Sequence, residues 1–547
     1  MKTNVSLCIA AALMVAACGD PSHRHNSGEK VSVVNSTPDE VIEEDVEITS
    51  NEAALMEPSA NATSKMILSS PPPPQQRNAE TYKEIKENSF VAVAQQPVTT
   101  FSADVDRAAY ANVRRIIGYG QIPPKDAVRI EEMVNYFDYD YPAPEEGSVS
   151  PLRVSPELAP APWNPNHLLL RIGLQAKKID LAKAPPSNIV FLIDVSGSMD
   201  EENKLPLLQS SFKLLLGQLR PDDKVAIVTY ANGTKVALPS TSVKDKEKII
   251  KVLDNLYASG GTSGGKGIQL AYEQAQKSFI KNGNNRIILA TDGDFNIGIN
   301  NTTDLEKFIE KQRESGIYMS VLGFGMGNYR DDMAETIADK GNGNYAYIDN
   351  ITEAKKVLVN ELSGTLFAVA KDVKLQLEFN PKYVKEYKLI GYENRMLANE
   401  DFTNDKKDAG EIGAGHTVTA LYELVPSDGK VAQSLRYQSQ ELNEKGKGNE
   451  LGFLKIRYKD PKVKDAKSVE ITEPLVFNKK ALKETSTDYR FAASVAEFGI
   501  LLRDNSNKAN ATYDQVIELA EGAIGKDPEG YRKEFVRLVK SVKMLPK

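Results

Sequence analysis

Cysteine, histidine and long hydrophobic runs are scarce in this 547-residue sequence. Its two cysteines and four histidines exclude a disulfide-stapled scaffold and argue against a metal cluster built from cysteine and histidine. No run of about 18 consecutive apolar residues occurs, so we expect no transmembrane helix. Lys and Arg number 68 against 75 Asp and Glu, a net charge of −7, and such a mild acidic excess does not favour nucleic-acid binding.

The rest of the composition is that of an ordinary soluble protein. Hydrophobic residues make up 41% and charged residues 26% of the chain. The length allows roughly three to five domains, at least one of which can bury a sizeable core.

The first residues read as a secretory signal peptide. Lys2 supplies a positive start, and the apolar stretch 5–15 is too short to span a membrane as a stable anchor. Val15-Ala16-Ala17-Cys18 resembles a bacterial lipobox. That resemblance implies that residues 1–17 are removed and that Cys18 becomes an acylated N-terminus, which anchors stably when several acyl chains are attached. An ordinary signal peptide cut near Ala17 is the alternative.

A polar segment follows the signal peptide. Residues 18–97 are rich in Ser, Asn, Glu and Pro, include the run Pro71–Pro74, and contain few aromatic residues. Such a composition buries too little apolar surface to offset the entropy of ordering, so we interpret 18–97 as a disordered tether. About 75 residues of this kind have a root-mean-square span of roughly 50 Å.

Residues 98–187 form a first folded segment with helical and strand patterns. Helical spacing of apolar residues predicts a helix over 103–117, capped by Ser102, and a second over 128–137. Strands are predicted over 153–158 and 167–175. We interpret the aromatic residues that follow the second helix, and the single tryptophan, as parts of a packed core: Tyr136, Phe137, Tyr139, Tyr141 and Trp163.

Residues 188–368 alternate apolar strand patterns with helical patterns. Strands are predicted over 189–193, 224–230, 286–290 and 318–322, and helices over 205–219, 246–257, 267–279 and 304–314. Short runs dense in Ile, Val and Leu are typical of parallel strands that are buried on both faces. The alternation predicts an α/β, doubly wound, Rossmann-like fold, in which ligands bind at the carboxyl ends of the strands.

Three polar loops lie where those strands end or a helix begins. Asp194, Ser196 and Ser198 form a D-x-S-x-S sequence directly after the first strand, Thr262 precedes a helix, and Asp292 follows another strand. Short hydroxyls and carboxylates are oxygen ligands of the kind that hard cations such as Mg²⁺ and Mn²⁺ prefer. The arrangement predicts a divalent-cation site at one edge of the sheet.

The three loops together resemble the metal-ion-dependent adhesion site of von Willebrand factor A domains. The resemblance implies that the hydroxyls of Ser196, Ser198 and Thr262 contact the ion, which we expect to be Mg²⁺, with Mn²⁺ or Ca²⁺ as alternatives. It implies that Asp194 and Asp292 act largely through water or other ligands. It also implies an open coordination position for an acidic residue of a partner protein.

Other glycine-rich and acidic loops do not support a nucleotide site. Residues 260–266 fit the start of a phosphate-binding loop, but Gly267 stands where a Ser or Thr is required. Residues 323–327 resemble a dinucleotide fingerprint without a suitably placed acidic residue, and we interpret them as a loop that needs glycine for its conformation. We therefore expect neither nucleotide nor nucleic acid as a ligand.

Residues 369–547 are predicted to be rich in strands and then helical. Strands are expected over 373–379, 416–425, 452–458 and 468–477, and helices over 488–502, 513–522 and 530–542. Several of these strands alternate apolar and polar residues, as in an antiparallel sheet with one buried face. Since predicted strands closely flank the A domain on both sides, we hypothesise one β-sandwich into which the A domain is inserted.

Segments outside the A domain resemble one bacterial family. Residues 127–133 and 135–139 look like the N-terminal segment of a family of A-domain lipoproteins, and 391–395 and 409–416 resemble its C-terminal domain of unknown function. This resemblance covers nearly the whole chain outside the tether and implies an architecture and a metal site.

The expected function is adhesion rather than catalysis. We expect a lipid-anchored protein of the bacterial cell envelope, preferably at the outer membrane, that binds a protein partner through the cation and is not an enzyme. A metal-independent envelope scaffold or assembly factor is the first alternative. A hydrolase with Ser196 or Ser198 as nucleophile is the second, although His167 and His416, the two histidines of the folded region, lie in no evident triad context.

Overall fold

The computed structural model describes most of the chain after residue 79. The described residues are 80–104, 106–262, 264–293, 302–327, 329–428, 448–463, 466–504 and 508–546. They belong to one compact unit, residues 74–547. The predicted signal peptide, Cys18 and the tether up to residue 79 lie outside the described residues. None of the helices described is both long and apolar enough to cross a membrane.

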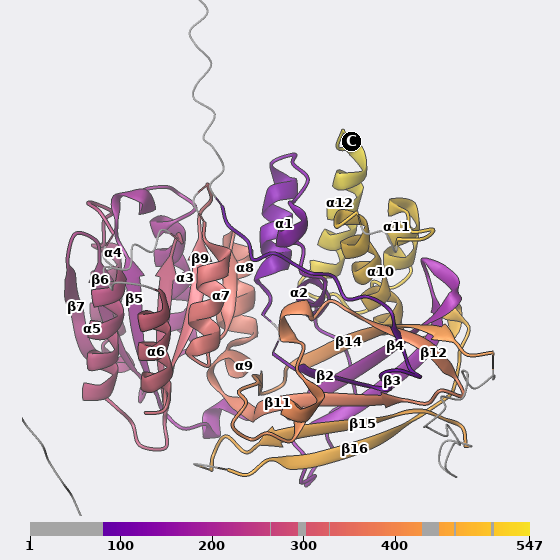
Figure 1. The fold of residues 1–547 in the computed structure, drawn as a ribbon. Helices are drawn as coiled ribbons and strands as arrows, with labels where there is room; N and C mark the ends of the chain where they lie inside the picture. Colours follow the sequence, from indigo (N-terminus) through magenta and orange to yellow (C-terminus); the bar gives the residue numbers. More distant parts are fainter. Residues whose placement is uncertain are drawn as a thin grey trace, which may run out of the picture. The chain divides into compact units, whose positions relative to one another are not determined.

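A six-stranded sheet forms the centre of the A domain, with strand order β10-β9-β8-β5-β6-β7 (Figure 1). All neighbours pair in parallel except β7, which is antiparallel to β6. The strands are β5 (Ser187–Asp194), β6 (Lys224–Tyr230), β7 (Thr234–Ser242), β8 (Asn284–Thr291), β9 (Ile317–Phe324) and β10 (Tyr345–Ile348). The doubly wound α/β prediction is confirmed.

Helices cover both faces of this sheet (Figure 1). They are α3 (Leu205–Gln218), α4 (Lys246–Asp254), α5 (Gly264–Lys277), α6 (Thr302–Arg313), α7 (Asp331–Lys340), α8 (Ile351–Lys355), a π-helical turn at Lys356–Asn360, and α9 (Leu362–Leu366). Successive residues of β5 point to opposite faces. Phe191 therefore joins the core under α3, whereas Val190 and Leu192 join the core under α5.

Strands from both sides of the A domain build a two-sheet sandwich. One sheet has the order β1-β12-β14-β4-β3, and the other has β13-β11-β15-β16 with β2 also paired to β11. Its strands are β1 (Val91–Ala92), β2 (Val98–Ser102), β3 (Leu152–Ala161), β4 (Asn164–Ala176), β11 (Ala368–Phe379), β12 (Val384–Ile390), β13 (Gly410–Gly413), β14 (Thr417–Pro426), β15 (Glu450–Lys459) and β16 (Val469–Val476).

The strand pairing hypothesised across the insertion is present. β4, before the A domain, pairs with β14, after it, so that Leu168 lies opposite Leu424. β2 pairs with β11 in the same way, with Thr100 opposite Gln376. Side chains of both sheets share one hydrophobic core, which makes the sandwich a single unit.

A layer of helices packs on the other face of the first sheet. The helices are α1 (Ala108–Gly118), α2 (Ile130–Asn135), α10 (Thr487–Leu502), α11 (Tyr513–Glu521) and α12 (Tyr531–Met544). Their core includes Leu169 of β4, whereas its neighbours Leu168 and Leu170 face the sandwich interior. The predicted aromatic core is confirmed here, since Tyr136, Phe137 and Trp163 are fully buried in it. We call the sandwich and these helices the flanking domain.

The first predicted helix was wrong at its N-terminus. The helix begins at Ala108 rather than at residue 103, and Ser102 ends β2 instead of capping a helix. The Ser102 hydroxyl oxygen accepts hydrogen bonds from the backbone N–H groups of Asp104 and Gly410. Tertiary pairing of β2 with β11 therefore overrides the local helical pattern.

The predicted tether also ends too late, because residues 80–97 pack against the folded unit. Val91 of β1 lies opposite Tyr387 of β12, and the ring of Phe90 stands edge-on to His167 at 5.5 Å. The amide of Asn88 donates to the carbonyl oxygens of Leu389 and Gly391. Hydrogen bonds and ring contacts to distant residues order a segment whose own composition is polar.

Candidate metal centre

The predicted site residues lie at the carboxyl edge of the A-domain sheet. Asp194 is the last residue of β5, and Asp292 directly follows β8. The two strands are parallel neighbours, with Ile193 opposite Ala290. This register places both carboxylates at the same edge, where ligands bind in doubly wound folds.

The first loop brings a carboxylate and two hydroxyls together. Oδ1 of Asp194 accepts a hydrogen bond of 2.9 Å from the backbone N–H of Ser196. A short 3₁₀ turn, Gly197–Met199, then folds the chain back so that the hydroxyl oxygens of Ser196 and Ser198 lie 3.0 Å apart. The alternating D-x-S-x-S spacing thus produces a compact group of oxygens.

The second loop lies directly against the first. The N–H of Gly197 donates to the carbonyl oxygen of Gly260 at 2.8 Å, two residues before Thr262. Gly260 has a φ of +80°, and a side chain there would run into Asn232. The structure therefore brings the Thr262 loop to Ser196 and Ser198, with Thr262 itself half-buried.

Asp194 and Asp292 are both completely buried. The Thr291 hydroxyl lies 3.4 Å from Oδ2 of Asp194 and accepts from the N–H of Gly293, so it links the two loops. Burial raises the pKa of Asp194 to about 7, the hydrogen bond from Ser196 opposes that rise, and the negative charge of Asp292 adds to it. Two buried carboxylates in one place call for a compensating positive charge.

Lys204 is a member of this site that the sequence analysis missed. Its ammonium lies 2.8 Å from the carbonyl oxygen of Ser198 and 3.3 Å from Oδ2 of Asp292, and only 3% of its side chain is exposed. It also lies 3.1 Å from Oε1 of Glu201, whose side chain is half-exposed. The sequence signal that could have identified Lys204 is its position six residues after Ser198. A lysine at such a position is equally compatible with a solvent-exposed side chain.

The donor set fits a hard divalent cation. The described residues contain no group of three His, Cys, Asp or Glu side chains that is suited to a metal, so a cation here relies on hydroxyl oxygens as well as carboxylates. Ser196, Ser198 and Thr262 would supply hydroxyls, and Asp194 and Asp292 would supply negative charge. A bound cation would in turn attract a carboxylate from outside.

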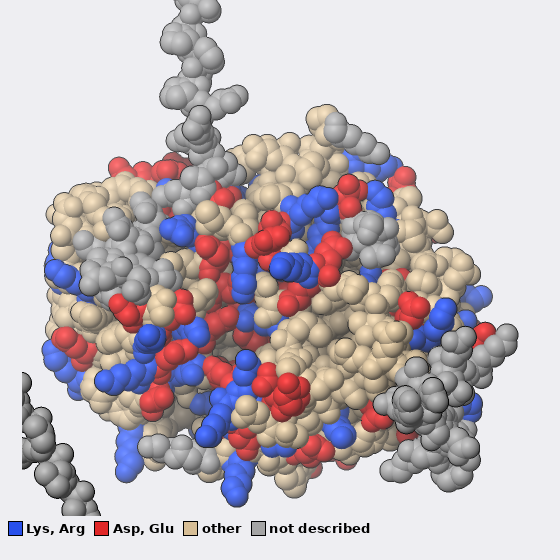
Figure 2. Space-filling view, viewed as in Figure 1, with Lys and Arg blue, Asp and Glu red and all other residues tan. Residues whose placement is uncertain are grey.

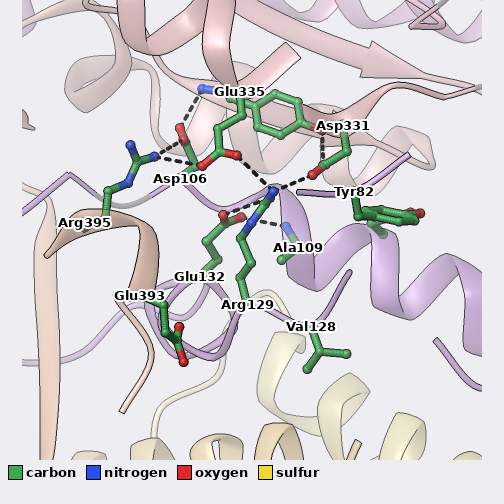
Figure 3. Close-up of polar contacts among 12 residues, drawn as sticks. Tyr82, Asp106, Ala109, Val128, Arg129, Glu132, Asp331, Glu335, Glu393 and Arg395 are labelled. Atoms are coloured by element: carbon green, nitrogen blue, oxygen red, sulfur yellow. Dashed lines mark hydrogen bonds and ion pairs between the residues drawn. The ribbon is translucent and has the colours of Figure 1, made fainter. Parts of the chain in front are cut away.

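A buried charge cluster joins the A domain to the flanking domain (Figure 3). Arg129, which precedes α2, forms ion pairs with Asp331 at 2.7 Å and Glu335 at 2.9 Å, both on α7. It also contacts Glu132 at 3.3 Å. Arg395, from beyond the A domain, contacts Glu335 on its other side at 3.3 Å. Segments of the flanking domain from before and after the A domain therefore both contact α7. This helix starts just after the loop that follows β9.

The two histidines of the folded region have their described contacts elsewhere. Nδ1 of His167 lies 2.6 Å from Oε1 of Glu423 in the flanking domain. The His416 ring packs against Gly364 of α9, and burial lowers the pKa of His416 to about 3. The contacts of Ser196 and Ser198 among the described residues include neither histidine.

Family comparisons match three consecutive regions of the chain. Residues 76–171 match "von Willebrand factor", 188–360 match "von Willebrand factor type A domain", and 364–545 match "Uncharacterized protein YfbK, C-terminal". The chain is 48% identical over 465 residues to the uncharacterized protein YfbK of Escherichia coli K12, covering 84% of this chain and 80% of that protein. The chain belongs to the YfbK family. The predicted membership of a bacterial A-domain family is confirmed.

The chain is also similar, at lower sequence identity, to a cyanobacterial protein and to a solved structure. The uncharacterized protein sll0103 of Synechocystis is 26% identical over 326 residues, covering 60% of this chain and 74% of that protein. A von Willebrand factor type A structure from Catenulispora acidiphila covers 84% of this chain and 91% of its own, at 14% identity and a TM-score of 0.39. Domains of this type typically mediate protein–protein interactions and often bind a divalent metal.

Proposed function

We propose that this YfbK family member is a lipid-anchored protein of the bacterial cell envelope that binds a partner protein through a divalent cation. The observation that carries the proposal is the pair of hydroxyls of Ser196 and Ser198, 3.0 Å apart and next to Asp194. Oxygen-only ligands favour Mg²⁺ over softer metals, with Mn²⁺ and Ca²⁺ as alternatives. An acidic residue of the partner would complete the coordination.

The surface beside the site suits a protein ligand. Tyr257 lies on the loop that leads to Thr262, and 74% of its surface is exposed. The same loop contacts the first site loop, since the N–H of Ser259 donates to the carbonyl oxygen of Val195 at 2.8 Å. Tyrosine is enriched in protein interfaces and among the residues that dominate their binding energy. Acidic and basic side chains are interspersed on the face drawn in Figure 2.

The membrane anchor is a separate part of the proposal and rests on the lipobox around Cys18. We propose the outer membrane as its location, because a long tether gives reach into the periplasm or the medium. Metabolic labelling with a fatty acid tests it: the full chain should carry the label in a membrane fraction, and Cys18→Ala should lose both the label and the fraction. Labelling that persists in Cys18→Ala would refute the anchor.

The decisive experiment is capture of envelope proteins on soluble Gly19–Lys547, first in Mg²⁺ and then in EDTA. Asp194→Ala is compared with Asp222→Ala, whose side chain is 62% exposed and which lies before the start of β6, at the opposite edge of the sheet. We expect one partner that is retained by the wild type and by Asp222→Ala in Mg²⁺ only.

A partner retained equally in Mg²⁺, in EDTA and by Asp194→Ala would refute cation-dependent binding. That result would favour the alternative, an envelope scaffold that acts through the flanking domain. The unfolding midpoint of each variant, measured without partner, serves as a control. It distinguishes a variant that has lost the site from one that has lost the fold.

A further inference from the structure

Lys204 places a fixed positive charge inside the candidate metal centre. Its ammonium contacts an oxygen from each of two site loops, the carbonyl of Ser198 and the carboxylate of Asp292. Because the side chain is 97% buried, these contacts are little screened by solvent. The ammonium therefore repels any other cation that binds at this site.

The loop after β9 packs closely against the Lys204 side chain. A Cβ atom on Gly325 would come within 2.3 Å of Lys204 Cε, so only glycine leaves room for the aliphatic part of the side chain. Gly325 has a φ of +76°, and its carbonyl oxygen accepts a hydrogen bond from the hydroxyl of Tyr347. The glycine-rich loop after β9, which the sequence analysis could explain only by its conformation, thus positions Lys204.

The charges of the site determine what Lys204 does to a metal ion. Asp194 and Asp292 carry two negative charges when ionised, and one divalent cation neutralises both. Lys204 adds one positive charge, and its third contact, Glu201, is half-exposed and therefore compensates it only weakly. With metal bound, the buried side chains named here, all from the described part of the chain, would together hold one positive charge in excess, which one incoming carboxylate would neutralise.

We propose that Lys204 is a built-in competitor for the divalent cation, which weakens binding of the metal alone and reserves tight binding for the metal together with an acidic ligand. This inference rests on the proposed metal site and adds the residue that regulates it. Like charges a few ångströms apart inside a protein repel strongly, so the effect on metal affinity is large enough to measure.

The test is a titration of soluble Gly19–Lys547 with Mn²⁺, in which electron paramagnetic resonance measures the concentration of free Mn²⁺ at each step. We compare the wild type with Lys204→Met, which keeps the length of the side chain without its charge, and with Lys204→Arg, which keeps the charge. We expect Lys204→Met to bind Mn²⁺ on the order of tenfold more tightly than the wild type, and Lys204→Arg to stay close to it. Equal or weaker binding by Lys204→Met overturns the proposal.

Two further variants separate this proposal from the metal site on which it rests. Lys204→Gln also removes the charge, so it replaces Lys204→Met if the latter fails to fold, and it should bind more tightly as well. Asp194→Ala should abolish binding. If Asp194→Ala abolishes Mn²⁺ binding but loss of the Lys204 charge does not tighten it, the result supports the metal site and refutes the proposed competition by Lys204. If no folded variant binds Mn²⁺, both fall together.

Discussion

Arg129 and Asp331 meet at 2.7 Å across the junction of the flanking domain and the A domain, and both side chains are almost completely buried. The residues are 202 positions apart in the chain. Asp331 also accepts a hydrogen bond of 2.6 Å from the hydroxyl of Tyr345, on the last strand of the A-domain sheet. The pair therefore fixes the start of α7 to the flanking domain.

Removing Arg129 should destabilise the protein strongly. Arg129→Met removes the ion pairs of the buried carboxylates of Asp331 and Glu132 with Arg129 and leaves Glu335 with Arg395 alone. Breaking buried pairs in this way costs about 3–5 kcal/mol. Urea unfolding measures this loss of stability. The fluorescence emission of Trp163, which is buried in the helical core of the flanking domain, monitors the unfolding.

The matched control for Arg129→Met is Arg153→Met. The Arg153 side chain is 44% exposed, and its ion pair with Glu145 measures 4.0 Å, so we expect a change below about 0.5 kcal/mol. Equal midpoints for the two variants would mean that the buried cluster does not hold the junction together.

Gly364 tests the contact between α9 and the sandwich. A Cβ atom at this position would lie 1.9 Å from Nε2 of His416, so Gly364→Ala must displace the imidazole or the helix, and we expect a loss of about 1–3 kcal/mol. Gly217→Ala is the control, because nothing lies within 4 Å of its added methyl group and alanine favours its helix. A stabilisation of both variants in thermal unfolding would contradict the close contact.

Glu497 should make the stability of the protein fall as the pH rises. This residue of α10 is fully buried, and burial raises the pKa of Glu497 from 4.5 to about 8. Between these values the folded state keeps a proton that the unfolded chain releases. The contribution is therefore complete below pH 4.5 and is lost as the pH rises towards 8.

Glu497→Gln isolates this effect, because glutamine stays neutral at every pH. We expect the difference in unfolding free energy between variant and wild type to grow in favour of the variant from pH 4.5 to pH 8, by an amount on the order of a few kcal/mol. Urea titrations at several pH values measure it. Parallel pH profiles for the two proteins would show that Glu497 has an ordinary pKa.

Glu80 should attach the start of the ordered segment 80–97 to the A domain. Its carboxylate accepts from the N–H of Gly327 at 2.9 Å and pairs with Arg115 at 2.8 Å. Glu80→Gln removes the charge from this pair, so we expect faster proteolysis of the chain just before residue 85. Glu87→Gln, at an exposed position, should be cleaved at the wild-type rate. Equal rates for all three proteins would contradict the attachment.

Much of the A domain could be predicted from local sequence. Strand β6 was predicted at its observed bounds, and the D-x-S-x-S loop was placed at the end of β5. Periodicity identifies buried strands and helices because it reports which residues are covered. The antiparallel edge strand β7 and the short strand β10 were missed, because their patterns resemble those of loops.

The sequence by itself therefore determined the doubly wound A domain, the position of the hydroxyl and carboxylate side chains at its strand ends and the aromatic core. Only the tertiary structure decided that β4 pairs with β14, that residues 80–97 are ordered, and that Lys204 enters the site beside Asp292. The physical reason is distance along the chain. Local patterns specify an element and its buried face, whereas the choice of partner depends on contacts between residues far apart, which many similar patterns fit equally well.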